Sequence, residues 1–382
     1  MTLITRRKLL VIGSGLALTA GGAGYYAMHK KVPLGFEPSD ELLKRGRHFV
    51  EKHLSIDVHA HPGRSFVSNA EHLNFKLWAY AALGSFESDT LADMKQGGLT
   101  AACFSTVSDF QLLDISKKGL SATREFEKGE AWQSYQHQMA RLKTVLTLDD
   151  VMQINTADDI QTAKEEHKIG ALFAAEGGDF LEESMDNLDT CYHDGIRVIT
   201  LMHYHINDIG DIQTQAPTHD GLSSFGELLV PAMNEKGMLI DLAHAAKSSF
   251  MRALELSSKP VMVSHTAIRR EGFDHPRFID QEQADAVVNA GGIIGAWPAG
   301  IGLETFKDYV DQIFHLVKEV GIDYVALGTD MDANYKPRFD NYQMLPLLAG
   351  SLLSQGMTES DVEKIFAGNF IRVFKAVTDT TA

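Results

Sequence analysis

Eight short apolar runs, rich in β-branched residues, alternate along the chain with longer stretches that have helical periodicity. The runs occupy residues 54–60, 99–107, 169–177, 197–203, 238–244, 261–267, 291–297 and 324–330. Near-continuous apolar strands that alternate with helices are typical of a parallel sheet covered on both faces. Eight such units over roughly 320 residues predict an α/β fold, a (β/α)8 TIM-like barrel with insertions in its loops.

The stretches with helical periodicity lie between the predicted strands. They occupy residues 123–145, 225–236, 248–257, 280–290 and 306–320, and the interval 108–168 is expected to hold helices with a structural role only. The chain then divides into three parts. We expect an export signal or N-terminal anchor at residues 1–30, a lead-in helix at 31–53 and the barrel domain at 54–378.

The N-terminal part differs in composition from the rest of the chain. Three basic residues, Arg6 to Lys8, are followed by an uncharged apolar stretch at residues 9–28. A basic segment before an apolar one is typical of an export signal, and the paired arginines resemble a twin-arginine signal. A retained membrane anchor is the alternative, because the stretch is near the roughly 20 residues that span a bilayer. We therefore expect an exported protein, either periplasmic or anchored in the membrane and facing outward.

The composition excludes one class of partner and predicts free thiols. A formal net charge of −16 argues against binding of nucleic acid. The hydrophobic fraction of 44% allows a sizeable core. The only two cysteines, Cys103 and Cys191, lie in apolar surroundings, and we expect two buried, unreactive thiols, with a disulfide between them as the alternative.

Ionisable residues stand at the C-terminal ends of six of the eight predicted strands. In chain order they are His59 and His61, Glu176, His203, His244, His265 and Asp330. A parallel barrel brings these strand ends together around one mouth, where barrel enzymes have their active sites. Each residue alone has a structural explanation, such as a core histidine or a helix cap. That explanation would have to hold on six strands at the same end, so we interpret the residues as one site.

Histidine and carboxylate ligands in this number suit zinc or a similar divalent ion. One catalytic ion needs about three protein ligands and an open position, so the set is too large for a single ion. Glu176 can bridge two ions roughly 3.5–4 Å apart through its two oxygens. His59 and His61 point to the same side of a strand end and are expected to bind one ion of the pair. We expect two divalent ions, zinc first among them, that share a hydroxide and polarise a carbonyl group.

From residue 54 to residue 377 the chain resembles the membrane (renal) dipeptidase family of binuclear zinc metallopeptidases. The resemblance rests on the segments AAEGGDF, RVITLMHYHIND, GLSSFGELLVPAMNEKGMLIDLAH, VMVSHTAIR, ALGTDMD and LLSQGMTESDVEKIFAGNFIRVF. It implies an amidohydrolase-like catalytic barrel in which Glu176 is the bridging ligand, while His244 and His265 complete the second metal.

The same resemblance implies roles for three further residues. His203 contacts the substrate and steadies the tetrahedral intermediate, and Asp330 serves the nucleophilic water near the first metal. Arg277, in HPRFID, binds the terminal carboxylate of the substrate, with Arg269 and Arg270 as the alternatives a few residues upstream. The implied activity is that of a zinc-dependent dipeptidase, a hydrolase that cleaves the amide bond of small peptides with a free carboxylate.

One position departs from the family pattern. The family has His-x-Asp on the first strand, and this chain has His59-x-His61, as in the wider amidohydrolase superfamily. The exchange leaves the metal pair one unit more positive and keeps two alternatives open. One is an enzyme of the same fold that acts on another amide, a lactam or a lactone. The other is a non-catalytic metal- or ligand-binding barrel.

Polar residues outside this set receive structural interpretations. Residues 204–221 form a long, polar stretch without periodicity, which we interpret as a lid over the site. His205, His219 and His275, in loops near the mouth, are expected on the surface, with contact to the substrate as the alternative. The expected partner is a dipeptide or another small molecule, while membrane attachment through the N-terminal segment and a homodimer stay open.

Overall fold

The computed structural model describes residues 32–67, 70–71, 73–82, 87–116 and 119–379 of the chain. The predicted export signal or anchor at residues 1–30 lies outside these ranges. Within them, no helix combines the length and the apolar character that crossing a membrane requires.

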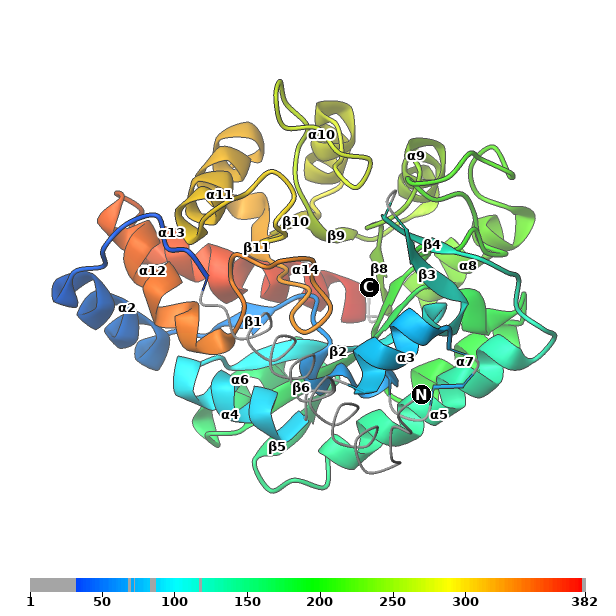
Figure 1. Ribbon diagram of the computed structural model, residues 1–382, viewed down its shortest axis with the longest axis horizontal. Helices are drawn as coiled ribbons and strands as arrows, with labels where there is room; N and C mark the ends of the chain where they lie inside the picture. Colours follow the sequence, from blue (N-terminus) through cyan, green and yellow to red (C-terminus); the bar gives the residue numbers. More distant parts are fainter. Residues whose placement is uncertain (1–31, 68–69, 72, 83–86, 117–118, 380–382) are drawn as a thin grey trace, which may run out of the picture.

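The main sheet has nine parallel strands, eight of which pair in one continuous order, and Figure 1 shows the sheet at the centre of the molecule with helices around it. In the order in which they pair, the eight are β1 (Ile56–Asp57), β2 (Ala101–Val107), β6 (Ile169–Glu176), β7 (Val198–Thr200), β8 (Leu239–Asp241), β9 (Met262–Thr266), β10 (Ile293–Ala296) and β11 (Val325–Leu327). The N–H of Val58 donates to the carbonyl of Leu327 over 2.8 Å, which brings the last strand beside the first. All eight lie within the predicted runs, and the predicted (β/α)8 barrel is confirmed.

The interval 108–168 holds the predicted helices, α5 (Glu130–Val145) and α6 (Ala157–Glu165), and also three short strands that were not predicted. Strand β5 (Val151–Ile154) pairs with the first half of β6. Strand β7 pairs with the second half of β6, along the same edge. Strands β3 (Leu113–Ser116) and β4 (Gly119–Ala122) form an antiparallel hairpin. Each of these strands has only four residues and does not lie within a longer apolar run as the barrel strands do, so no sequence pattern separates it from a loop.

Helices cover the outside of the barrel. They are α2 (Asp40–Lys52), α3 (Phe75–Ala82), α4 (Glu87–Gly97), α5 (Glu130–Val145), α6 (Ala157–Glu165), α7 (Met185–His193), α8 (Ser224–Glu235), α9 (Lys247–Leu256), α10 (Gln281–Asn289), α11 (Phe306–Val320), α12 (Leu345–Ser354), α13 (Glu359–Glu363) and α14 (Asn369–Thr378). Polar side chains cap the first turns of several helices. For example, the Thr305 side chain accepts a hydrogen bond from the N–H of Asp308, and α11 begins at Phe306, directly after Thr305. The predicted lead-in helix is α2, which packs against α12.

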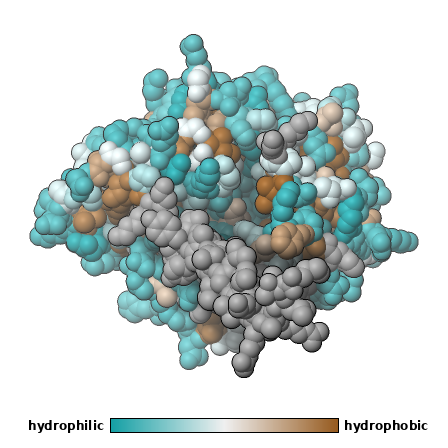
Figure 2. All heavy atoms as spheres, in the orientation of Figure 1, coloured by the Kyte–Doolittle hydropathy of each residue, from teal (hydrophilic) through white to brown (hydrophobic). Residues whose placement is uncertain are grey.

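The interior of the barrel is apolar at the end where the strands begin. Inward-facing side chains such as Val198, Leu239 and Met262 form one buried cluster with Phe370 and Phe374 of α14. Both cysteines are buried and free, which confirms the prediction of two unpaired thiols. On the face drawn in Figure 2, hydrophilic side chains predominate and hydrophobic ones lie in small separate groups. Because apolar residues fill one end of the barrel, a polar site is left to the other end, where the strands finish.

Candidate metal centre

The structure brings the seven predicted strand-end residues together. His59 and His61 follow β1, Glu176 ends β6, His203 and His244 follow β7 and β8, His265 belongs to β9, and Asp330 follows β11. All seven are buried. The parallel strands all run toward this end, so the topology of the sheet alone explains why residues up to 271 positions apart meet.

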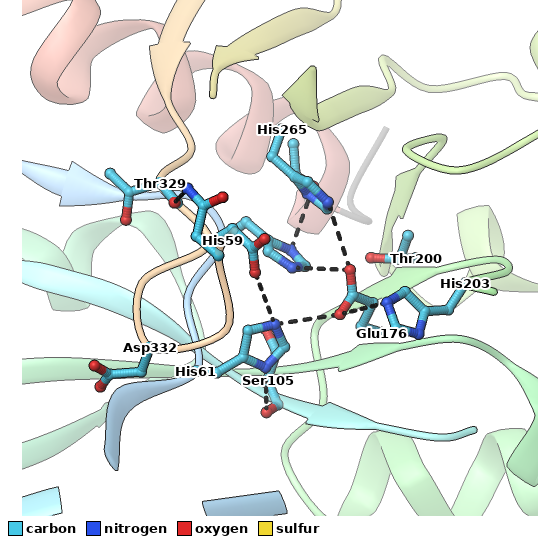
Figure 3. A network of polar contacts seen from close by, with 12 residues as sticks. His59, His61, Ser105, Glu176, Thr200, His203, His265, Thr329 and Asp332 are labelled. Atoms are coloured by element: carbon cyan, nitrogen blue, oxygen red, sulfur yellow. Dashed lines mark hydrogen bonds and ion pairs between the residues drawn. The ribbon is translucent and has the colours of Figure 1, made fainter. Parts of the chain in front are cut away.

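The Glu176 carboxylate lies at the centre of the site, with histidines on both sides of it (Figure 3). Its Oε1 lies 3.2 Å from Nε2 of His59, 3.1 Å from Nε2 of His244 and 3.6 Å from Nε2 of His265. Its Oε2 lies 3.2 Å from Nε2 of His61 and 3.5 Å from Nε2 of His203. One carboxylate therefore joins histidines from four other strands.

These donors fit two divalent ions. His59, His61 and Glu176 form one group, and Glu176, His244 and His265 form another, with the ligand atoms of each group within 4.8 Å of one another. The buried Nε2 atoms of His59 and His61 have no hydrogen-bond partner, as expected of nitrogens that ligate a metal. Glu176 belongs to both groups, which suits a bridging ligand.

A third combination, His59, Asp241 and His265, is less suitable for a metal. The oxygens of Asp241 already accept hydrogen bonds from Thr200 Oγ1 at 2.6 Å and from the N–H groups of Ala243 and Ser264 at 3.0 and 2.8 Å. A carboxylate saturated in this way positions its neighbours and is not free to bind an ion.

One hydroxyl group orients two of the histidines. Ser264 Oγ donates to Asp241 Oδ2 over 2.5 Å and lies 2.8 Å from Nδ1 of His265 and 3.3 Å from Nδ1 of His59. Because the Ser264 hydroxyl donates its hydrogen to Asp241, its oxygen is free to accept from the Nδ1–H groups of both histidines. The Nε2 lone pairs of both rings then face Glu176. Neither Ser264 nor Asp241 was predicted from the sequence, because the only signal of each is a polar residue inside an apolar strand.

Electrostatics favours the metal-binding form of Glu176 and of two histidines, His244 and His265. Although burial opposes its charge, the histidines around Glu176, above all His203 and His59, hold the pKa of this carboxyl well below its ordinary value. Burial and the nearby Arg277 hold the pKa of His244 well below its ordinary value, and burial and His59 do the same for His265. These two imidazoles are therefore neutral, the form that ligates a metal.

His203 is held by a residue that the sequence analysis did not identify. Asp109 Oδ1 lies 2.6 Å from His203 Nδ1, and Asp109 Oδ2 accepts from the N–H of Tyr204 over 2.9 Å. Burial lowers the pKa of His203, but the charges of Asp109 and Glu176 outweigh it and raise that pKa to about 9. His203 is thus a charged donor at neutral pH. Asp109 follows β2 by two residues, and its position after a strand was the available signal.

Asp330 lies beside the first group of ligands. Its Oδ1 is 3.5 Å from Nε2 of His61, and its N–H donates to the carbonyl of His59 over 2.8 Å. Burial, together with the negative charge of Glu176, raises the pKa of Asp330 to about 6. Its backbone is left-handed, with φ of 54°, which an L-residue adopts only where its surroundings hold it.

Arg277 lies on the opposite side, beside the second group. Its Nη2 is 2.9 Å from Nε2 of both His244 and His265, and its Nη1 donates to Gln213 Oε1 over 2.7 Å. The guanidinium also lies over the Trp297 ring, 5.2 Å from its centroid.

The two alternative arginines point elsewhere. Arg269 Nε donates to the carbonyl of Phe278 over 2.9 Å, and the Arg270 guanidinium lies 3.9 Å from the centroid of the Phe273 ring. Of the three, Arg277 is the arginine that contacts the predicted ligands.

The segment 204–221, which we interpreted as a lid, forms a wall of the site through Gln213. Its fold depends on Asp211, whose carboxylate accepts from the backbone N–H groups of Thr218, His219 and Gly221 at 2.6, 3.0 and 2.8 Å.

His205 is not on the surface, contrary to the prediction. It is buried between Asp179, 2.7 Å from its Nδ1, and Glu125, 2.9 Å from its Nε2. Two carboxylate partners offset the cost of burying the ring, and an unpatterned sequence gives no sign of them. His219 is exposed, as predicted, and His275 is half-buried.

A parallel barrel that gathers histidines around one glutamate at its C-terminal mouth has the architecture of a metal-dependent hydrolase. The comparison with protein families identifies it further. The chain belongs to the membrane dipeptidase family, peptidase family M19, whose model matches residues 43–382. The resemblance noted in the sequence is therefore confirmed.

Individual relatives agree with this assignment. Dipeptidase tcpJ of Claviceps purpurea is 30% identical over 243 residues, which cover 61% of this chain and 57% of that protein. Dipeptidase 3 of Mus musculus is 28% identical over 239 residues, which cover 59% of this chain and 47% of that protein. The matched part of this chain thus spans about half the length of these relatives. The structure of the probable dipeptidase PvdM from Pseudomonas aeruginosa has a TM-score of 0.73 at 18% identity and covers 90% of this chain and 100% of that one, which supports the barrel fold.

Proposed function

We propose that the protein is a dipeptidase that uses two divalent ions, with zinc the expected metal, to hydrolyse the amide bond of small peptides with a free carboxylate. The observation that carries the proposal is the position of Glu176, whose carboxylate belongs to two buried ligand groups at once. Membership of the membrane dipeptidase family supports it. The presence of an arginine beside the second group supports a substrate with a carboxylate.

Metal ligands, a general base and a hydrogen-bond donor would have separate roles in the reaction. The ions held by His59, His61, Glu176, His244 and His265 would supply an activated water and polarise the carbonyl under attack. Asp330 accepts the proton that the nucleophile releases, because a carboxyl group with a pKa of about 6 is suited to general base catalysis near neutral pH. His203 donates its Nε2–H to the negative charge that develops on the substrate oxygen.

Arg277 would bind the terminal carboxylate of the substrate. A guanidinium presents two parallel N–H donors that match the two oxygens of a carboxylate. Its position against His244 and His265 orients the substrate so that the carboxyl-terminal residue lies on the side of the second ligand group.

Metal removal and reloading test the proposal. The full chain is treated with a chelator, reloaded with Zn²⁺ and assayed against a library of dipeptides. We expect about two ions per chain, the number that two ligand groups predict, and activity that is lost with the metal and restored by it. Turnover by the metal-free protein would contradict the mechanism, and a reloaded protein that cleaves no dipeptide would contradict the substrate class.

A second candidate function follows from His61. Because the family has a carboxylate at this position, an enzyme of the same fold that acts on another amide, a lactam or a lactone is the alternative. The comparison of a dipeptide with its C-terminal amide separates the two. Equal turnover of the two compounds would favour the alternative.

We also propose that residues 1–30 direct export by the twin-arginine route. The proposal rests on the sequence alone, on Arg6 and Arg7 before an uncharged stretch. Replacement of both arginines by lysine in the full chain should keep the protein in the cytoplasm, and unchanged export would contradict the proposal.

A further inference from the structure

Arg64 follows the first pair of histidines and has an unusual backbone. It lies in η1 (Pro62–Val67), and its N–H donates to the carbonyl of His61 over 2.8 Å. Gly63 and Arg64 both have left-handed conformations, with φ of 70° and 53°. This conformation is ordinary for glycine and uncommon for arginine. Backbone strain of this kind persists where the surrounding structure holds it, and it is frequent at ligand sites.

The guanidinium of Arg64 is fixed on two sides. Its Nε donates to the carbonyl of Asp332 over 3.0 Å, and the group lies 4.5 Å from the centroid of the Tyr80 ring. The Tyr80 hydroxyl donates to the same carbonyl over 3.0 Å. These contacts use one N–H and one face of the guanidinium, and they leave the donors at its end available.

Among the described residues, no carboxylate forms an ion pair with Arg64. The Asp332 carboxylate accepts instead from the N–H of Gly63 and from Thr90 Oγ1, both at 2.8 Å, and in Figure 3 it points away from Glu176. Arg64 Nη1 is buried and has no hydrogen-bond partner. A buried donor of a charged group that lacks a partner costs free energy, which an anionic ligand would recover.

Arg64 and Arg277 are held by different parts of the site, Arg64 by the loop after β1 and Arg277 by contacts with the histidines of the second ligand group. Phe66, two residues on, has its ring centroid 5.3 Å from that of His61. The carbonyl that holds the guanidinium belongs to Asp332, two residues after Asp330, whose carboxylate is 3.5 Å from His61. Arg277 contacts the histidines of the second ligand group, whereas Arg64 is joined to the loops that carry His61 and Asp330.

We propose that Arg64 binds a second carboxylate, on the side chain of the amino-terminal residue of the substrate. The inference rests on the proposed function. If Arg277 holds the terminal carboxylate and the amide bond lies over Glu176, the amino-terminal residue extends toward His61 and Arg64. The preferred substrates are then dipeptides that begin with aspartate or glutamate.

The experiment compares two dipeptides that differ in one charge, Glu-Ala and Gln-Ala, on the Zn²⁺-loaded full chain. The measured quantity is the ratio of their kcat/KM values, which cancels changes in folding or metal content. We expect wild type to favour Glu-Ala by about ten- to a hundredfold, the range for one charge-assisted hydrogen-bonded pair. Arg64→Met should bring the ratio close to one, and Arg64→Lys, which keeps the charge without the planar fork, should give an intermediate ratio.

Arg372 supplies a matched control at the other end of the barrel. It also lies over a tyrosine, 5.7 Å from the Tyr324 centroid, and donates to the carbonyls of Gly291 and Asp323, which precede β10 and β11. Arg372→Met should leave the ratio as in wild type. A wild-type ratio of one or less, or a preference retained by Arg64→Met, would overturn the inference.

Calorimetry separates this inference from the proposed function. If the loaded wild type cleaves neither dipeptide, the proposed function fails, but the binding of Glu-Ala and Gln-Ala can still be measured. Tighter binding of Glu-Ala by wild type that Arg64→Met abolishes would support the role of Arg64. Equal binding of the two dipeptides by wild type would refute it.

Discussion

The carboxylate of Asp109 lies 2.6 Å from Nδ1 of His203, and this contact joins the loop after β2 to the loop after β7. Both oxygens of Asp109 accept hydrogen bonds, the second from the N–H of Tyr204. Asparagine has only one acceptor oxygen, so Asp109→Asn must leave one of the two donors facing an NH₂ group. We expect kcat to fall by about ten- to a hundredfold, as for other residues that orient an active-site histidine.

Two further measurements make this prediction specific to His203. The metal content of Asp109→Asn should equal that of wild type, because Asp109 is in neither ligand group. Asp194 is the control, since it also accepts two hydrogen bonds, in its case from the side chains of Tyr135 and Lys143, but stands before β7 at the other end of the barrel. Wild-type kcat in Asp109→Asn, or an equal loss in Asp194→Asn, would show that His203 does not need its carboxylate.

Ser264 is predicted to affect both metals at once. Its hydroxyl contacts Nδ1 of His59, from the first ligand group, and Nδ1 of His265, from the second. Ser264→Ala removes the acceptor of both Nδ1–H groups, so either imidazole can turn its lone pair away from the site. We expect the affinity for each ion to fall by about ten- to a hundredfold. Competition with a chromophoric chelator measures both affinities, and a loss confined to one ion would contradict the shared role.

Asp330 is predicted to act on the rate more than on metal binding. Asp330→Asn keeps the shape of the side chain and removes the base. Loss of a general base costs about 10²–10⁴-fold in rate, and we expect kcat to fall in that range while most of the metal stays bound. Steady-state kinetics and metal analysis on one preparation test the prediction together. An unchanged kcat would assign the proton transfer to another group.

The sequence predicts those parts of the structure that have a local pattern of their own, and it does not predict those that depend on tertiary contacts. The eight barrel strands lie within apolar runs of seven to nine residues, and the direction of a parallel sheet then brings His59, Glu176 and Asp330 to one end. Strand β5 has four residues, and its pairing with β6 is a tertiary contact that no local pattern specifies.

The supporting side chains were harder to predict for a similar reason. Asp109 and His203 are 94 residues apart, and a single polar residue after a strand resembles any turn. Ser264 and Asp241 acquire their role only through side-chain directions that the fold sets. The residues missed are those that position the predicted ligands.

Arg277 distinguishes a dipeptidase from a general amidohydrolase. Arg277→Lys keeps the charge but loses the planar pair of donors. We therefore expect kcat/KM for a dipeptide to fall by at least about tenfold. The C-terminal amide of the same dipeptide should be a poor substrate for wild type and should be little affected by the substitution. If wild type cleaves the amide at the same rate as the free acid, the dipeptidase assignment is contradicted and a general amidohydrolase is favoured.

His61 is the position where this chain departs from its family, and its two substitutions give opposite predictions. His61 Nδ1 donates to the carbonyl of Ser105 over 3.2 Å, which directs Nε2 toward Glu176. His61→Ala removes a ligand of the first group only, so one ion should be lost while Glu176, His244 and His265 hold the other. His61→Asp adds a negative charge in a buried site, so the first ion should bind more tightly than in wild type. Metal stoichiometry and chelator competition on the two variants test whether His61 is a ligand. An alanine variant that keeps both ions would mean that it is not, and that His59 and Glu176 hold the first ion without it.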